Sequence, residues 1–149
     1  MTTEINTRIT ESEWEIMRVV WTLNKVTSKE IIEVLQEKKD WKPATTKTFI
    51  GRLVKKRMLN TESHGKRYIY SAAVSEDETV KNVTNEFFDN ICSKDVGKTI
   101  AEMISTSTLS FDDIDLLEEV IGKKKKTAVK EVKCNCLKGQ CQCKNHHNH

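Results

Sequence analysis

The sequence has no long hydrophobic segment. Its first thirty residues contain no apolar stretch like that of a secretory signal, and no run approaches the roughly 20 apolar residues of a membrane span. We therefore expect a soluble intracellular protein of the cytoplasm. A chain of 149 residues can bury one compact core, or one small domain with an appended oligomerisation segment, and we favour the second organisation.

Catalytic patterns are also missing. The sequence has no glycine-rich phosphate loop and no nucleophile motif, and His64 is its only histidine before residue 146. We therefore expect that the chain is not an enzyme.

Charge is distributed unevenly along the chain. Residues 1–73 carry 14 Lys and Arg against 9 Asp and Glu, residues 74–122 carry 3 against 12, and residues 123–149 carry 8 against 1. A basic first block suits a polyanion, whereas an acidic middle block does not. Any contact with nucleic acid is therefore predicted within residues 1–73.

The first block predicts two short helices near its start. Apolar residues recur at helical spacing after Thr10, with Ser12 as the expected cap, at Trp14, Met17, Val20 and Trp21. The segment Thr27-Ser28-Lys29-Glu30 is a capping box, which predicts a second helix ending near Glu37.

A third helix and a hairpin follow. Pro43, the only proline, suits the first turn of a helix that runs to about Met58. Residues 59–63 and 68–71 read as two strands around a basic turn at residues 64–67. Three helices followed by a hairpin form a winged helix, whose third helix enters the major groove of DNA. The predicted fold is thus mainly α with a small β-hairpin, with a winged helix-turn-helix at its N-terminal end.

Hydroxyl and basic residues on the third helix and in the turn are the candidate DNA contacts. Small hydroxyl residues let a backbone approach DNA, and Lys and Arg reach base edges and phosphates, although such residues are also common on solvated surfaces. The candidates are Lys42, Thr45, Thr46, Lys47, Thr48, Arg52, Lys55, Lys56, Lys66 and Arg67.

Two amphipathic segments after residue 75 predict a helical dimerisation region. Their apolar faces need a partner, and a second copy of the chain is the simplest one. The candidate interface residues are Val83, Phe87, Ile91, Ile114, Leu117, Val120 and Ile121. We therefore divide the chain into a DNA-binding domain at 1–75, a dimerisation region at 76–122, and a flexible basic linker with a cysteine-rich tail at 123–149.

The tail carries two Cys-x-Cys pairs, at Cys134 and Cys136 and at Cys141 and Cys143. Four thiolates suit a tetrahedral zinc site, and soft sulfur ligands also favour Cu(I) or an iron–sulfur cluster. Gly139 lets the chain reverse so that the two pairs face each other. The alternative is a pair of disulfides, which belongs to oxidising compartments.

Three further features have competing interpretations. Cys92 lies on the apolar side of its segment, far from the tail, and is interpreted as a buried packing residue more readily than as a ligand. Residues His146, His147 and His149 either assist metal capture or are solvated. Trp41 is left without an assigned role.

These motifs resemble the BlaI/MecI family of winged-helix repressors, and with the tail they resemble its copper-responsive CopY-type members. The resemblance rests on residues 9–17, on residues 42–56, on the wing strand Tyr68-Ile69-Tyr70 and on the Cys-x-Cys-x4-Cys-x-Cys tail. It covers nearly the whole chain. Arg57 stands where family members commonly have glycine, which puts the end of the third helix in question.

The resemblance implies a homodimer on a palindromic operator of the TACAnnTGTA type. It also implies that the zinc-loaded protein represses, that Cu(I) displaces zinc and releases the DNA, and that a copper chaperone can act as the Cu(I) donor. Two alternatives stay open from the residues alone. One is a protein that sequesters or delivers Cu(I) or zinc and uses its winged helix to dock to protein, and the other is a zinc- or cadmium-sensing repressor of the same fold.

Overall fold

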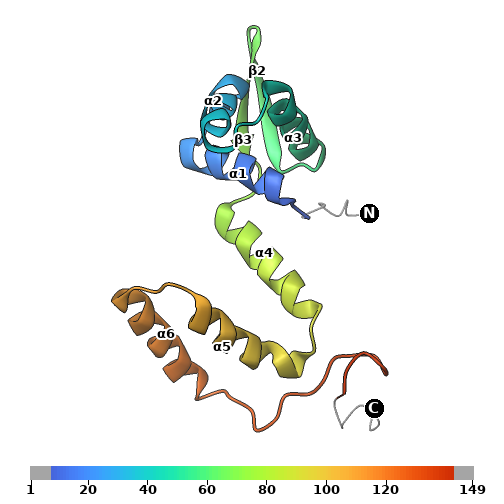
Figure 1. The fold of residues 1–149 in the computed structure, drawn as a ribbon, viewed down its shortest axis with the longest axis vertical. Coiled ribbons are helices and arrows are strands. Elements are labelled where there is room, and N and C mark those ends of the chain that lie inside the picture. The colour runs from blue at the N-terminus through green and yellow to red at the C-terminus, as the bar shows by residue number, and fades with distance from the viewer. Residues whose placement is uncertain (1–7, 143–149) are drawn as a thin grey trace. The chain divides into compact units, whose positions relative to one another are not determined.

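The computed structural model describes residues 8–142 and divides into two compact units, residues 1–84 and 85–149 (Figure 1). Among the described residues, no helix is long and apolar enough to cross a membrane. The elements are α1 (Glu11–Leu23), β1 (Val26–Thr27), α2 (Ser28–Lys39), α3 (Pro43–Lys55), β2 (Leu59–His64), β3 (Arg67–Ala72), α4 (Glu76–Asp89), the 3₁₀ turn η1 (Ser93–Asp95), α5 (Val96–Thr106) and α6 (Phe111–Lys124).

Capping boxes begin the first two helices. The Thr27 side chain accepts from the Glu30 amide, as its motif predicts. For α1 the prediction was wrong by two residues, because Thr10 and not Ser12 is the N-cap and pairs reciprocally with Glu13. The box satisfies two amide groups that a helix start otherwise leaves without partners.

A three-stranded antiparallel sheet in the order β1-β3-β2 completes the winged helix. The predicted hairpin runs in register from the Leu59–Ala72 pair to the His64–Arg67 pair, and Gly65 takes the left-handed conformation in its turn (φ +64°). The sequence did not predict β1, which has only two residues and pairs with β3. The mainly α fold with a small sheet is confirmed.

The core of this unit lies between the three helices and the sheet. Its side chains are Ile16, Met17, Val19, Val20, Val26, Ile31, Leu35, Ile50, Leu53, Met58 and Leu59. Trp41 and Phe49 pack against this cluster from its edge. Trp21 also packs there and donates from Nε1 to the Val74 carbonyl at 2.9 Å, so the chain after the wing is tied back to α1.

Arg57 closes α3 although it is not glycine. It adopts the left-handed conformation (φ +63°), the Arg57 amide donates to the Val54 carbonyl, and the Met58 amide donates to the Leu53 carbonyl. These two bonds form the Schellman motif that commonly ends a helix. The motif therefore forms at Arg57, with a left-handed residue that carries a Cβ atom.

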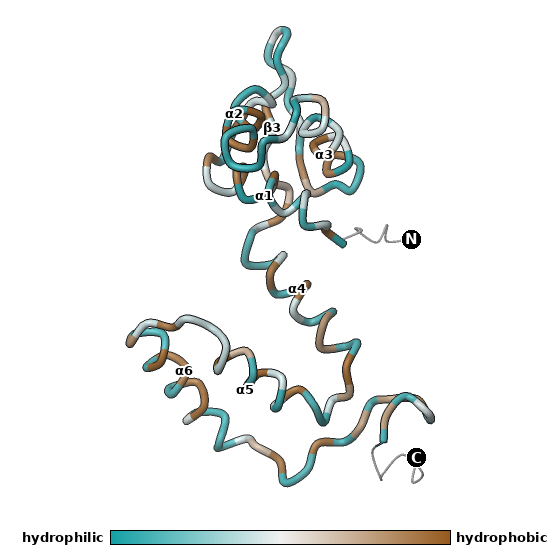
Figure 2. Tube along the Cα trace, viewed as in Figure 1, coloured by the Kyte–Doolittle hydropathy of each residue, from teal (hydrophilic) through white to brown (hydrophobic). Residues whose placement is uncertain are grey.

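The second unit is helical and has little core of its own. The sequence predicted two amphipathic segments after residue 75, whereas the structure has three helices, because α5 lies between them. The chain reverses between α5 and α6 (Figure 1). No residue of α5 or α6 is buried. Hydrophobic stretches nevertheless recur along both helices (Figure 2), and the exposed apolar side chains include Phe111, Leu116, Val120 and Ile121.

Candidate nucleic-acid interface and candidate metal centre

The exposed face of α3 and its N-cap gathers most of the predicted DNA contacts. We call it the α3 basic face, and its exposed members are Lys42, Thr45, Lys47, Thr48, Arg52 and Lys55. The helix presents them together because Ile50 and Leu53 are buried on its other side. Gly51 lies within this face, and a Cβ atom there would meet nothing within 4 Å.

An aromatic pair supports Arg52. The Trp41 and Phe49 rings lie 5.2 Å apart between centroids, and the Arg52 guanidinium carbon lies 5.4 Å from the Phe49 ring centroid. A guanidinium over an aromatic face is attracted by the ring and restricted in its motion. Trp41, which had no assigned role, thus packs against the Phe49 ring, and the Arg52 guanidinium lies over that ring.

The wing adds a second set of cations. Lys66 and Arg67 are exposed at the β2–β3 turn. A groove of about 540 Å³ lies between α3 and the sheet, with Lys47 and Lys55 on its helical side and Tyr68 on its sheet side. Tyr68 was not among the predicted DNA contacts, and it is 59% exposed. Cations and a phenol hydroxyl around an open groove are groups that contact phosphate oxygens.

Thr46 is not part of this surface. It is fully buried, and its hydroxyl has no hydrogen-bond partner within the described part of the chain. Its predicted role as a DNA contact was wrong because Thr46 lies four and seven residues before Ile50 and Leu53, on the buried side of α3. A run of threonines does not distinguish one side of a helix from the other, whereas the helical period does.

The phosphate contact of Lys56 stays a prediction, but the structure gives this side chain a partner inside the protein. Its Nζ lies 2.7 Å from Oε1 of the fully buried Glu13 and donates to the Arg8 carbonyl at 2.8 Å. Lys56 therefore neutralises a buried carboxylate inside the protein. The partner lies 43 residues away in the sequence, so no local pattern indicated it.

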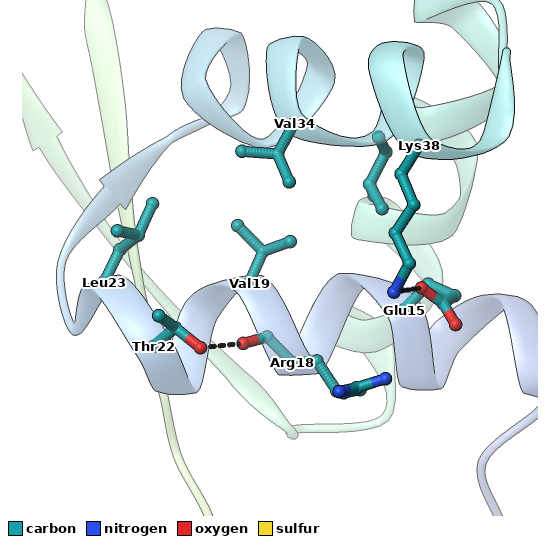
Figure 3. Close-up of a pocket in the computed structure, with 8 residues that line it drawn as sticks. Glu15, Arg18, Val19, Thr22, Leu23, Val34 and Lys38 are labelled. Atoms are coloured by element: carbon teal, nitrogen blue, oxygen red, sulfur yellow. Dashed lines mark hydrogen bonds and ion pairs between the residues drawn. The ribbon is translucent and has the colours of Figure 1, made fainter.

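A smaller hollow of about 230 Å³ lies between α1 and α2 (Figure 3). Val19, Leu23 and Val34 line it, and the Glu15–Lys38 ion pair closes one end with an N–O distance of 3.1 Å. The Thr22 hydroxyl donates a hydrogen bond to the Arg18 carbonyl of the same helix.

The second unit brings four thiols together, at Cys92, Cys134, Cys136 and Cys141. Their sulfur atoms all lie within 4.8 Å of one another. Cys134 is central, because its sulfur is 3.5 Å from that of Cys92 and 3.4 Å from that of Cys141. These separations exceed the roughly 2.05 Å of a disulfide bond. We call these four residues the thiol cluster.

Three tail residues of the cluster were predicted as ligands, whereas Cys92 was interpreted as a packing residue. Cys92 is indeed buried, with 7% of its surface exposed, but its sulfur faces another sulfur. Cys143 and the three C-terminal histidines lie outside the described residues. Gly139 has a φ of +94° in the turn that leads from Cys136 to Cys141, the reversal that the sequence predicted there.

Local hydrogen bonds order the tail around the cluster. The Cys136 amide donates to the Cys134 sulfur at 3.4 Å, which draws the two residues of this pair together. The Leu137 amide donates to Oε1 of Gln140, and the Gln140 amide donates to the Leu137 carbonyl. These bonds close the loop that connects Cys136 to Cys141.

The cluster supplies soft sulfur donors of the kind that thiophilic cations prefer. Desolvation, followed by the sulfur atoms of Cys134, Cys92 and Cys141, raises the pKa of Cys136, because a thiolate is unfavourable beside other thiols away from water. A thiophilic cation reverses that preference, since its ligands are the thiolates. Four sulfurs around a zinc ion at about 2.3 Å lie about 3.8 Å apart, and the shortest separations here are close to that value.

Comparisons with known proteins identify the family. The profile described as "Penicillinase repressor" matches residues 9–123. The methicillin resistance regulatory protein MecI of Staphylococcus aureus is 28% identical over 116 residues, which cover 78% of this chain and 94% of MecI. The chain belongs to the penicillinase repressor family. It is a transcriptional repressor whose first unit has the winged-helix arrangement, and proteins of this family are not enzymes.

Two further similarities complete the comparison. An uncharacterized 16.5 kDa protein in the ptsI 3′ region of Latilactobacillus sakei is 45% identical over 140 residues, which cover 94% of this chain and 96% of that protein. The solution structure of the DNA-binding domain of the repressor BlaI is similar at 30% identity and a TM-score of 0.46, over 48% of this chain and 88% of that one. The family match ends at residue 123, so Cys92 lies inside it and the tail cysteines lie beyond it.

Proposed function

We propose that this repressor responds to a thiophilic metal. In this proposal it binds a palindromic operator as a zinc-loaded homodimer, and Cu(I) displaces zinc and releases the DNA, as in CopY-type repressors. The observation that carries the proposal is the thiol cluster, four sulfurs within 4.8 Å in a chain that also has a winged-helix domain. Family membership identifies the chain as a repressor. The four soft sulfur donors support the proposal that a metal regulates it.

In the proposal, the α3 basic face makes the contacts with base edges and the wing makes contacts with phosphates. In the proposal Arg52, held over Phe49, reaches base edges in the major groove, and Thr45 and Thr48 allow the helix to approach. Lys66 and Arg67 in the wing contact phosphates. The operator is expected to be of the TACAnnTGTA type.

A homodimer supplies the second half of the palindrome. Each winged helix reads a half-site, and two-fold symmetric dimers match palindromic DNA. The exposed apolar side chains of α6, such as Ile114, Val120 and Ile121, would be covered by the partner copy. Leu117 and Val83 are partly buried, and Phe87 is 45% exposed within one chain, so they also remain available to a partner.

Net charge does not explain a switch between zinc and copper. Four thiolates with one Zn²⁺ carry the same net charge as four thiolates with two Cu⁺, so repulsion of DNA by the loaded site does not change. The difference lies in geometry, because zinc requires four ligands in a tetrahedron. In the proposal, that requirement holds the tail residues in the arrangement that favours the operator-bound dimer. A tenfold change in operator affinity needs a coupling of only about 1.4 kcal/mol.

The decisive experiment titrates the operator complex under anaerobic conditions. A fluorescent duplex of the TACAnnTGTA type is bound by zinc-loaded protein, and anisotropy is followed together with bound metal as Cu(I) is added. We expect the anisotropy to fall as zinc leaves the protein. Release by Cd²⁺ or excess Zn²⁺ but not by Cu(I) would instead identify a zinc or cadmium sensor.

Two controls separate repression from metal storage. A scrambled duplex reports non-specific binding, and the variant with Cys134, Cys136, Cys141 and Cys143 all changed to serine has lost its tail ligands. We expect that variant to bind the operator, and copper to leave its affinity unchanged. A protein that binds Cu(I) tightly yet prefers the operator no more than the scrambled duplex would be a storage or delivery protein.

A further inference from the structure

We propose that Cys92 is a metal ligand, together with Cys134, Cys136 and Cys141 of the tail. This inference rests on the proposed function, because it names a ligand of the same metal site. A tail-only site uses the four cysteines of the two Cys-x-Cys pairs. The site proposed here includes a sulfur from outside the tail, which comes from the helical region 42 residues before Cys134.

Geometry supports this donor set. The Cys92 and Cys134 sulfurs are 3.5 Å apart, and every pair among the four sulfurs lies within 4.8 Å. Small movements of the side chains convert such a group into a tetrahedron with edges of about 3.8 Å. Cys92 and Cys134 are buried and Cys136 and Cys141 are partly buried, so the group has an inner and an outer side. Such a site excludes water on one side and admits a metal on the other.

Separate contacts hold the tail against the segment that carries Cys92. The Ser93 amide donates to Oδ1 of Asn135 at 2.8 Å, and the Ser93 hydroxyl donates to the Lys133 carbonyl. Lys94 Nζ pairs with Glu131 Oε1 at 3.0 Å. These three contacts place residues 131–135 beside residues 93–94 without involving any sulfur. The approach of Cys134 to Cys92 therefore has support that does not depend on cysteine chemistry.

Cys92 gives the tail a physical connection to the helices. It is the N-cap residue of η1, which leads directly into α5. A metal held by Cys92 and three tail cysteines fixes the tail to the segment between α4 and α5. The coordination geometry that the metal requires then constrains the helical region, which the proposed function assigns to dimerisation.

The experiment uses the full chain with Cys143→Ser, which retains four cysteines. Cobalt(II) is the probe because it occupies tetrahedral thiolate sites and its coordination can be measured by X-ray absorption and by sulfur-to-cobalt charge-transfer bands. We expect one cobalt per chain with four sulfur ligands, as in wild type. Since only four cysteines remain, that result requires Cys92. The matched control, Cys92→Ser with Cys143→Ser, should fall to three sulfurs and lose more than tenfold in zinc affinity.

The remaining outcomes each decide the question. Three or fewer sulfurs in Cys143→Ser, with four kept in Cys92→Ser, would overturn the inference and leave the proposed function intact. If titration of the anaerobic wild-type protein finds two thiols fewer than its sequence contains, two cysteines form a disulfide. That result would also overturn the inference. No sulfur coordination in wild type would refute the proposed function itself. The Cys143→Ser arm keeps Cys92 in place, so a folding defect caused by changing Cys92 cannot obscure it.

Discussion

Lys56 Nζ and Glu13 Oε1 are 2.7 Å apart, and this ion pair joins the end of α3 to the start of α1. The same Glu13 oxygen accepts from the Thr10 amide at 2.9 Å as part of the capping box. One carboxylate therefore both begins α1 and anchors the residue that follows α3. Burial raises the pKa of Glu13, but the hydrogen bonds from Lys56 and Thr10 outweigh it and hold the pKa below its ordinary value of 4.5.

The first prediction concerns stability and pH. Because the pKa of Glu13 is lower in the folded than in the unfolded protein, the pair stabilises the fold above the unfolded value of 4.5, and this stability is lost as the pH falls through the lower folded pKa. Lys56→Met leaves a buried carboxylate unpaired and should lower the free energy of unfolding at pH 7 by about 3 kcal/mol. Denaturant unfolding from pH 4 to 7 measures both effects.

The loss in Lys56→Met should shrink toward pH 4, because the unpaired buried carboxyl then takes up a proton. Lys55→Met is the control, since Lys55 is exposed on the neighbouring position and should change stability little. A pH-independent difference between Lys56→Met and wild type would show that the pair contributes only packing.

The second prediction separates two adjacent threonines. Thr46→Val replaces a buried hydroxyl that has no partner in the described structure with a methyl group of similar size, so unfolding free energy should rise by about 1 kcal/mol. Operator affinity should not change. Thr45→Val, on the exposed side, should weaken operator binding with little effect on stability. Thermal melts and anisotropy on the same samples test both, and the reverse pattern would mean that the wrong side of α3 has been assigned to DNA.

The third prediction assigns specificity to α3 and general affinity to the wing. Arg52→Ala should cost about 1–3 kcal/mol on the operator and much less on random DNA, because base-edge contacts discriminate between sequences. Lys66→Ala should weaken both DNAs and flatten the dependence of log affinity on log salt by about one unit. Equal losses on both DNAs for Arg52→Ala would limit that residue to backbone contact.

The fourth prediction concerns Gly51, at the centre of the α3 basic face. Alanine is a better helix former than glycine by about 0.5–1 kcal/mol, and the added methyl group meets nothing within the protein, so Gly51→Ala should stabilise the domain. Operator affinity should nevertheless fall, because the methyl group occupies space between α3 and the groove. Gly97→Ala, in α5, is the control and should stabilise without affecting DNA binding. Unchanged affinity in Gly51→Ala would show that DNA does not approach that position closely.

The fifth prediction tests the dimer. Val120→Glu with Ile121→Glu places two charges on the apolar side chains of α6, and the protein should sediment as a monomer at micromolar concentration. Affinity for a full palindrome should fall while affinity for a half-site stays the same. Val129→Glu is the control, because Val129 is 68% exposed and lies beyond the helix. A wild-type protein that is itself monomeric would contradict the assigned interface.

Local patterns in the sequence determine much of this fold. Capping boxes, the single proline and the alternation of the wing strands act within a few residues, so they indicate elements directly. The two-residue strand β1 lacks such a pattern because its pairing with β3 defines it. Sequence reasoning also missed helix α5, which has only 11 residues, although Ile100, Met103 and Ile104 recur in it at helical spacing.

The candidate sites depend in part on contacts that the sequence alone does not determine. The spacing of the tail cysteines predicted a thiol-rich site, and the basic residues of the third helix predicted a DNA-binding face. The helical period, which is present in the sequence, places Thr46 on the buried side of α3, whereas only the tertiary structure showed that Lys56 pairs with a carboxylate 43 residues away. Only chain folding could bring Cys92 to Cys134, because contacts between distant residues depend on how the whole chain packs and leave no mark in local spacing.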